Sequence, residues 1–187
     1  MSIAALLAAD KETALFKAAS AGSFANHQTN GQVTIGADAY VSGDKVKTAF
    51  GKLDPYQYGV LPVLVVIQND SGKTIRLDEL KAVYVGPNND RVEATPAKEV
   101  RYLEGPNRPR MIPGPGGQVK VLKGKNPLAA WEIEGRAMAA QMLPAGQTAS
   151  GFFYFQTGLQ RGATLYLSGL SEAATGKELL YFELTLQ

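Results

Sequence analysis

The stretch Val60-Leu-Pro-Val-Leu-Val-Val-Ile-Gln68 is the strongest strand signal in the sequence. It is rich in β-branched residues and almost continuously apolar, which is typical of a strand covered on both faces. Side chains alternate along a strand, so we expect Val65 to face one layer and Leu64 and Val66 to face the other. Pro62 lacks an N–H and should therefore lie near the start of the strand or at a bulge.

Three further strands are predicted in the last third of the chain. Residues 150–156, SGFFYFQ, follow a Leu-Pro-Ala-Gly-Gln turn at 143–147 and carry aromatic side chains on both faces. Residues 163–170 and 177–186 continue the sheet. In the last of these strands both alternating sets contain large apolar residues, which indicates a strand buried on both sides.

The length and composition fit one mainly β domain with a sizeable core. The chain has 187 residues, of which 45% are hydrophobic and 19% are charged, as in ordinary globular proteins. We predict an immunoglobulin-like antiparallel β-sandwich over residues 23–187, with loop 104–125 and helix 126–141 inserted. Residues 1–22 are predicted to form an N-terminal helix, because Ala, Leu, Lys and Glu dominate residues 3–19. An alternative for its apolar start is the end of a signal peptide.

The inserted helix is predicted from a cap and an apolar stripe. Asn126-Pro127 is typical of a helix start, and the apolar residues after it are spaced three and four apart. They are Leu128, Trp131, Gly135, Met138 and Met142. We therefore expect Trp131 to be buried and Gly135 to allow close approach of the helix backbone to the sheet. Glu132 and Arg136, four residues apart, should form an ion pair.

The stretch 104–125 is predicted to be a loop, and residues 105–125 of it are predicted to contact a protein partner at the surface. Its prolines and glycines exclude regular helix, and a brief strand is predicted at 119–121. Loops of this length in compact domains are usually functional or disordered, so a connector without a role is the alternative. The charged residues of 105–125 are all basic, so we expect an acidic or polar partner surface. The candidate binding residues are Arg108, Arg110, Lys120 and Lys123, together with Trp131.

Composition removes several classes of site. There is no cysteine and one histidine, His27, so disulfides, thiolate chemistry and a multi-histidine metal site within one chain are excluded. No catalytic residue, metal site or cofactor is predicted, because no phosphate loop, calcium loop or serine elbow is present. The net charge is +2 and the basic residues are scattered, so no nucleic-acid partner is expected. No apolar stretch approaches the ~20 residues of a membrane span.

Three runs of the sequence resemble a family of uncharacterised bacterial proteins, many of them exported. The runs are YGVLPVLVVIQND at 58–70, NPLAAWEIEGRA at 126–137 and LPAGQTASGFFYF at 143–155. A strand that ends in Asn69-x-Ser71, followed much later by Leu-Pro-x-Gly, is also similar to immunoglobulin-like domains of bacterial envelope proteins. These resemblances imply the sandwich fold and a location outside the cytoplasm, and they imply no activity and no catalytic residue.

We therefore expect a non-enzymatic structural or binding module of the bacterial cell envelope or exterior, periplasmic or extracellular, with a cytoplasmic location as the alternative. Two other functions stay open: a carbohydrate or small-ligand binder that uses Trp131 or the tyrosines, and a hydrolase with carboxylates from separate strands. A protein partner is expected, and a homo-oligomer is left open. A pocket with two carboxylates ~5–9 Å apart would favour the hydrolase, whereas an open groove floored by aromatic rings would favour the ligand binder.

Overall fold

The computed structural model describes residues 16–101, 110–113, 119–122 and 126–187. The N-terminal helix predicted at 3–19 falls mostly outside these residues. Its described part, 16–20, is not helical, and the first helical turn within the described residues is η1 (Ala21–Ser23). Phe16 explains the difference, because its ring packs against Tyr40 and Phe152, with centroids 6.0 and 5.6 Å apart. This contact holds the segment against the sheet instead of leaving it to form local helix.

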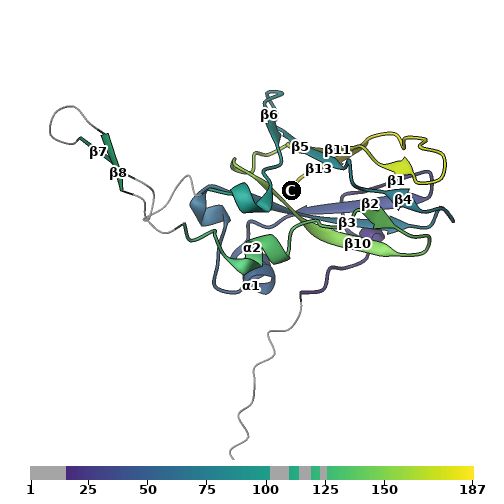
Figure 1. Cartoon of the computed structure of the whole chain (residues 1–187), viewed down its shortest axis with the longest axis horizontal. Coiled ribbons are helices and arrows are strands. Elements are labelled where there is room, and N and C mark those ends of the chain that lie inside the picture. The colour runs from purple at the N-terminus through teal and green to yellow at the C-terminus, as the bar shows by residue number, and fades with distance from the viewer. Residues whose placement is uncertain (1–15, 102–109, 114–118, 123–125) are drawn as a thin grey trace, which may run out of the picture.

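A four-stranded antiparallel sheet forms the centre of the molecule (Figure 1). Its order is β1 (His27–Asn30), β2 (Val33–Ala39), β3 (Leu61–Asn69) and β10 (Thr148–Phe155). The prediction of a central strand buried on both faces is confirmed, because residues 60–67 of this region are all buried. Pro62 lies at the second position of β3, and its carbonyl accepts a hydrogen bond from the Tyr40 N–H (2.9 Å).

A second antiparallel sheet of four strands packs on one face of the first. Its order is β13 (Phe182–Thr185), β11 (Thr164–Ser168), β5 (Lys81–Val85) and β6 (Arg91–Glu93). The larger core lies between the two sheets, where Val65 and Ile67 of β3 are buried in one cluster with Tyr84 and Leu165. The two sheets therefore meet through their alternating apolar faces.

The opposite face of the first sheet is covered by helices, as Figure 1 shows. Leu64 and Val66 belong to a second buried cluster there, together with α1 (Gly43–Phe50) and α2 (Trp131–Gly135). In α1, Val46, Ala49 and Phe50 are the buried residues, as expected for an amphipathic helix. The 3-10 turns η2 (Tyr56–Tyr58) and η3 (Ala97–Glu99) complete the helical content of the described residues. The central strand is thus continuously apolar because it separates two cores.

Two small sheets complete the described structure. One has the order β12 (Ser171–Glu172), β4 (Ile75–Arg76) and β9 (Met142–Leu143), and the other pairs β7 (Arg110–Pro113) with β8 (Val119–Leu122). The brief strand predicted at 119–121 is confirmed as β8, whereas the predicted loop 104–125 also contains β7. The molecule is therefore mainly β, with several antiparallel sheets and few short helices. Within the described ranges, no helix combines the length and apolar character needed to cross a membrane.

The helix predicted at 126–141 is wrong in its length. The helix α2 has five residues, and the chain beyond it runs along the edge of β10. The Phe152 N–H donates to the Arg136 carbonyl (2.8 Å), and the Met138 N–H donates to the Phe152 carbonyl (3.1 Å). A Cβ on Gly151 would lie 2.4 Å from the Met138 Cα, so this close approach requires glycine. Pairing with an open strand edge replaces the last turns of the predicted helix.

The strand predicted at 177–186 is also shorter than expected and is buried on one side. The strand β13 begins at Phe182 and alternates between buried and exposed residues. Leu180, which the prediction of a strand buried on both sides also covers, is 71% exposed. The reason lies in the preceding segment, where the Leu179 N–H donates to the Leu170 carbonyl (2.8 Å) instead of joining the sheet. Tyr181 stacks on Tyr166, with ring centroids 5.0 Å apart.

Candidate binding site

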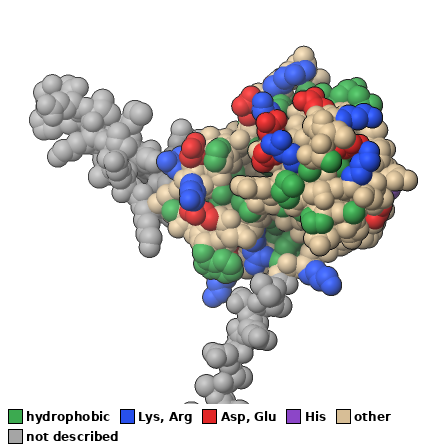
Figure 2. Space-filling view, turned by 45° about the vertical axis from the view of Figure 1, so that its right-hand side comes forward, with side chains coloured by type: hydrophobic (Ala, Val, Ile, Leu, Met, Phe, Trp, Pro, Cys, Tyr) green, Lys and Arg blue, Asp and Glu red, His purple; other side chains and the backbone are tan. Residues whose placement is uncertain are grey.

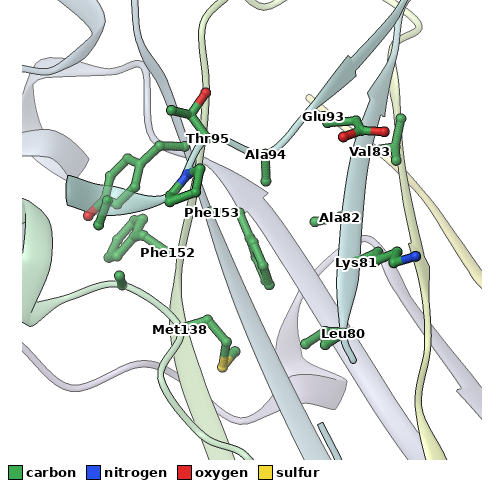
Figure 3. Close-up of a pocket in the computed structure, with 14 residues that line it drawn as sticks. Leu80, Lys81, Ala82, Val83, Glu93, Ala94, Thr95, Met138, Phe152 and Phe153 are labelled. Carbon is green, nitrogen blue, oxygen red and sulfur yellow. The ribbon is translucent and has the colours of Figure 1, made fainter. Parts of the chain in front are cut away.

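A cavity of about 350 Å³ lies between the edge of the first sheet and strands β5 and β6 of the second. Figure 3 shows the ring of Phe153 in its centre, with Met138 and Leu80 below and Ala82 and Ala94 beside it. These residues come from four separate segments of the chain. The cavity therefore depends on the packing of the two sheets and could not be recognised as a local motif.

Alternation along β10 places Phe153 in the cavity. Phe153 packs against the core between the sheets, whereas its neighbours Phe152 and Tyr154 belong to the core beneath the helices. The chain crosses between the two sheets at Ala94 and Thr95, which line the cavity. The Ala94 N–H donates to Ala82 of the second sheet (3.0 Å), and the Thr95 N–H donates to the Tyr154 carbonyl of the first (2.8 Å). Both walls are thus fixed by backbone hydrogen bonds.

The cavity is apolar inside and polar at its rim. Its walls are mainly alanine, leucine, methionine and phenylalanine, and its polar lining residues are Lys81, Glu93, Thr95 and Tyr154, whose hydroxyl is bound to the Ile133 carbonyl. Lys81 and Glu93 are exposed, and Figure 3 shows the amino group of Lys81 pointing away from the cavity. Among the described residues, Glu93 is the one carboxylate in the lining. This arrangement can hold an apolar molecule, but it offers no pair of carboxylates for acid–base chemistry.

Two buried tyrosines support the first sheet beneath the helices. Burial raises the pKa of Tyr154, and the nearby positive charge of Arg136 opposes this only in part. Its hydroxyl donates a hydrogen bond to the Ile133 carbonyl of α2 (2.8 Å). Burial, with a contribution from Asp38, raises the pKa of Tyr40 to about 12. Both phenols are therefore neutral at physiological pH and act as structural hydrogen-bonding or packing groups.

Trp131 is exposed, so its predicted burial is wrong. Its side chain is 64% exposed, because α2 ends four residues later and the predicted stripe does not continue. Leu128 and Ile133 are the buried apolar residues of this region instead. A Cβ on Gly135 would lie 3.2 Å from the Trp131 Cε3 atom. Gly135 therefore makes room for the indole ring and does not serve an approach of the helix to the sheet.

The basic residues predicted to bind a partner are only partly placed. Arg108 and Lys123 lie outside the described residues. Arg110 lies on β7 and Lys120 on β8, where Lys120 pairs with Ile112. The described lining of the cavity contains none of these residues and not Trp131. The one signal that could have indicated the cavity was the second aromatic face of 150–156, which carries Phe153.

The Glu132–Arg136 pair and His27, both considered in the sequence analysis, do not form a functional site in the described residues. The predicted ion pair between Glu132 and Arg136 is absent from the described residues, because the Arg136 guanidinium lies by the rings of Phe16 and Trp131. His27 is exposed, and its Nδ1 donates to the Phe24 carbonyl (2.7 Å). The described part of the chain contains no cluster of three or more residues that could hold a metal ion.

We expect the fluorescence of the native protein to report an exposed indole. Trp131 is the single tryptophan of the chain, so the signal has one source. Its emission should be red-shifted and readily quenched by iodide and acrylamide. Because a substitution at an exposed position changes stability by only about 0.5 kcal/mol, Trp131→Phe should melt close to the wild type. A blue-shifted emission that resists both quenchers would contradict the exposed position.

No protein-family model matches the chain, and no curated protein matches it. Among solved structures, it is similar to the yjhA protein of Bacillus subtilis, with 13% identity, a TM-score of 0.46 and coverage of 88% of this chain and 98% of that one. It is also similar to a functionally unknown protein from Listeria monocytogenes (11% identity, TM-score 0.37, 85% and 79% covered). A third is a DUF4426 family protein from Pseudomonas aeruginosa (9% identity, TM-score 0.33, 85% and 90% covered). The structural similarity is to uncharacterised bacterial proteins, and no sequence family is identified.

Proposed function

We propose that the chain is a non-enzymatic binding module that takes a small, mainly apolar ligand into the cavity between its two sheets. The observation that carries this proposal is the cavity of about 350 Å³ with apolar walls around Phe153. Pockets for small molecules are typically about 300–1,000 Å³ and mostly apolar, with a few polar groups that orient the ligand. The cavity meets each of these conditions.

The lining supplies an adaptable contact surface. Phe153, Met138 and Leu80 are each only partly buried by the protein itself, so a ligand would remove further apolar surface from water, at about 25 cal/mol per Å². Methionine fills irregular gaps because its side chain is unbranched and polarizable. The Thr95 hydroxyl and the Glu93 carboxylate at the rim favour a ligand with a hydrogen-bond donor at one end.

The other functional expectations from the sequence stay proposals beside this one. We propose an immunoglobulin-like sandwich, which the two facing antiparallel sheets support, and action in the cell envelope or outside the cell, which the sequence resemblance supports. A protein partner at 104–125 and a homo-oligomer are also proposals. On the face shown in Figure 2, hydrophobic side chains form several separate groups among charged ones. This face therefore offers no large apolar patch in support of a protein partner. The hydrolase receives no support from a cavity with one carboxylate.

Filling the cavity should abolish ligand binding without unfolding the protein. Ala94 is partly buried and faces the cavity in Figure 3, so the larger side chain of Ala94→Leu should occupy the ligand volume. We expect the neutral dye N-phenylnaphthylamine to fluoresce strongly with the wild type and weakly with the variant. The melting temperature should be unchanged or slightly raised, because cavity filling commonly stabilises proteins by about 0.5–2 kcal/mol.

The matched control is Ala129→Leu, which adds the same side chain at an exposed position. This variant should bind the dye as the wild type does. Equal dye fluorescence in the wild type and Ala94→Leu would show that the dye binds elsewhere and would contradict the proposed site. Dye binding that appears only near the melting temperature would have the same meaning, because partly unfolded chains also expose apolar surface.

A further inference from the structure

A second hollow, of about 180 Å³, lies against the face of β10 that the helices cover. It is lined by Phe16, Trp131, Arg136 and Phe152, among others. Leu64 and Phe152 are directly paired neighbours on β3 and β10 and contribute to its floor. Ala137 and Phe152 line both this hollow and the cavity between the sheets, whereas Phe153 lines only the cavity and Phe16, Trp131 and Arg136 line only the hollow, so the two can be tested separately.

Arg136 lacks a polar partner in this hollow. Its Nε atom is buried and has no hydrogen-bond partner, and no other buried side-chain nitrogen or oxygen in the described residues is in this state. Such groups are rare in folded proteins, and each calls for an explanation. The described ion pairs of the chain do not include Arg136. The guanidinium therefore keeps unused hydrogen-bond donors at the wall of a hollow.

Two aromatic rings hold the guanidinium in place. Its central carbon lies 5.5 Å from the ring centre of Phe16 and 5.8 Å from that of Trp131, which is within the range of cation–π attraction. This attraction fixes the orientation of the group but does not satisfy its N–H donors. A planar guanidinium with free donors matches a carboxylate, which can accept two parallel hydrogen bonds.

From this geometry we infer that the hollow binds a small organic carboxylate with a planar apolar body. Arg136 would pair with the carboxylate, and the exposed indole of Trp131 would stack on the body of the ligand. Phe152 and Leu64 supply apolar walls on the side of the sheet. A volume of about 180 Å³ suits a molecule of the size of phenylacetate and is too small for an extended polymer.

The single tryptophan provides a direct test. Phenylacetate titrated into the full chain should change the Trp131 emission in a saturable way. The neutral analogue phenethyl alcohol should bind at least about tenfold more weakly, because hydrogen bonds to charged groups are worth that much or more. An equal response to the alcohol would overturn the inference. A tighter response to phenyl phosphate would overturn the assignment of a carboxylate.

Variants at Arg136 separate ligand recognition from folding. Arg136→Met keeps an unbranched apolar stem and removes the guanidinium with its charge, so phenylacetate binding should fall at least about tenfold. The exposed Arg91 of β6 provides the control, since Arg91→Met makes the same change far from the hollow and should leave binding unchanged. Unchanged binding in Arg136→Met would overturn the inference.

A second variant keeps the test decisive if Arg136→Met fails to fold. Arg136→Lys retains the positive charge but loses the planar pair of donors. Its affinity for phenylacetate should lie below that of the wild type, while phenethyl alcohol should bind both proteins equally. If Arg136→Lys binds phenylacetate as tightly as the wild type, the paired hydrogen bonds of the guanidinium are not involved and the inference is wrong.

Discussion

Val65→Asp should prevent folding. Val65 is fully buried at the centre of β3, where it pairs with Ala37 of β2 on one side and Gly151 of β10 on the other. A carboxylate at this position would face the core between the sheets, and the described neighbours offer no basic partner there. We expect a loss of more than about 4 kcal/mol, the size that marks a buried unpaired charge. This is comparable to the total stability of many domains, about 5–15 kcal/mol.

The measurement is urea unfolding followed by circular dichroism, with Thr185→Asp as the control. Thr185 lies in β13 with its side chain exposed, so the same charge on a strand should change the free energy of unfolding by only about 0.5 kcal/mol. We expect Val65→Asp to lack a cooperative transition. A melting temperature within a few degrees of the wild type would contradict the placement of Val65 between the layers.

The central strands could be predicted from the sequence because their signal is local and strong. In 60–67 the residues of both alternating sets are apolar, so either assignment of faces buries the strand. The structure confirms this, with Val65 in one core and Leu64 in the other. The aromatic run of β10 is confirmed for the same reason, since Phe152 and Phe153 enter different cores. Such strands need no knowledge of their neighbours to be recognised.

The extent of α2, the extent of β13 and the position of the cavity depend on contacts between distant segments, which the spacing of residues in the sequence does not reveal. The stripe from Leu128 to Met142 fits a helix, but the open edge of β10 offered backbone hydrogen bonds from Arg136 onward. Because the helix is short, Trp131 is exposed and not buried as the stripe predicted. The cavity likewise joins Met138, Thr95 and Phe153, which are far apart in the chain. The exposure of Trp131 and the free guanidinium of Arg136 have the same non-local origin.

Asn69 connects the Asn-x-Ser motif at 69–71 with the Leu-Pro-x-Gly motif at 143–146, the two motifs on which the resemblance to envelope domains rests. It is the last residue of β3 and is fully buried, although its side chain is polar. Its Nδ2 donates to the carbonyls of Lys73 (2.7 Å), Leu143 (2.9 Å) and Pro144 (3.1 Å). Its Oδ1 accepts from the backbone N–H and the hydroxyl of Ser71 (3.1 and 2.6 Å). The Asn-x-Ser and Leu-Pro-x-Gly motifs are therefore two sides of one hydrogen-bonded joint.

Asn69→Ala should destabilise the protein by about 3 kcal/mol or more, because each buried group left without a partner costs about 1–3 kcal/mol. This corresponds to a melting temperature lower by about 10 °C for a chain of this size. The control is Asn88→Ala, which removes an exposed amide in the turn before β6 and should have little effect. An Asn69→Ala variant that melts with the wild type would show that the three carbonyls find other donors.

Asn69→Asp should be equally harmful at neutral pH, and its cost should fall in acid. The new carboxylate would face three carbonyl oxygens, which disfavours the charged form and raises the pKa of this group above its unfolded value of about 3.9. A group with a raised pKa in the folded state stabilises that state below the unfolded pKa, and this stabilisation is lost as the pH rises through the folded pKa. The difference in melting temperature between Asn69→Asp and the wild type should therefore widen from pH ~4 to pH ~7. A difference that does not change with pH would mean that the carboxyl has turned out to solvent, and that the side chain of Asn69 does not hold the joint.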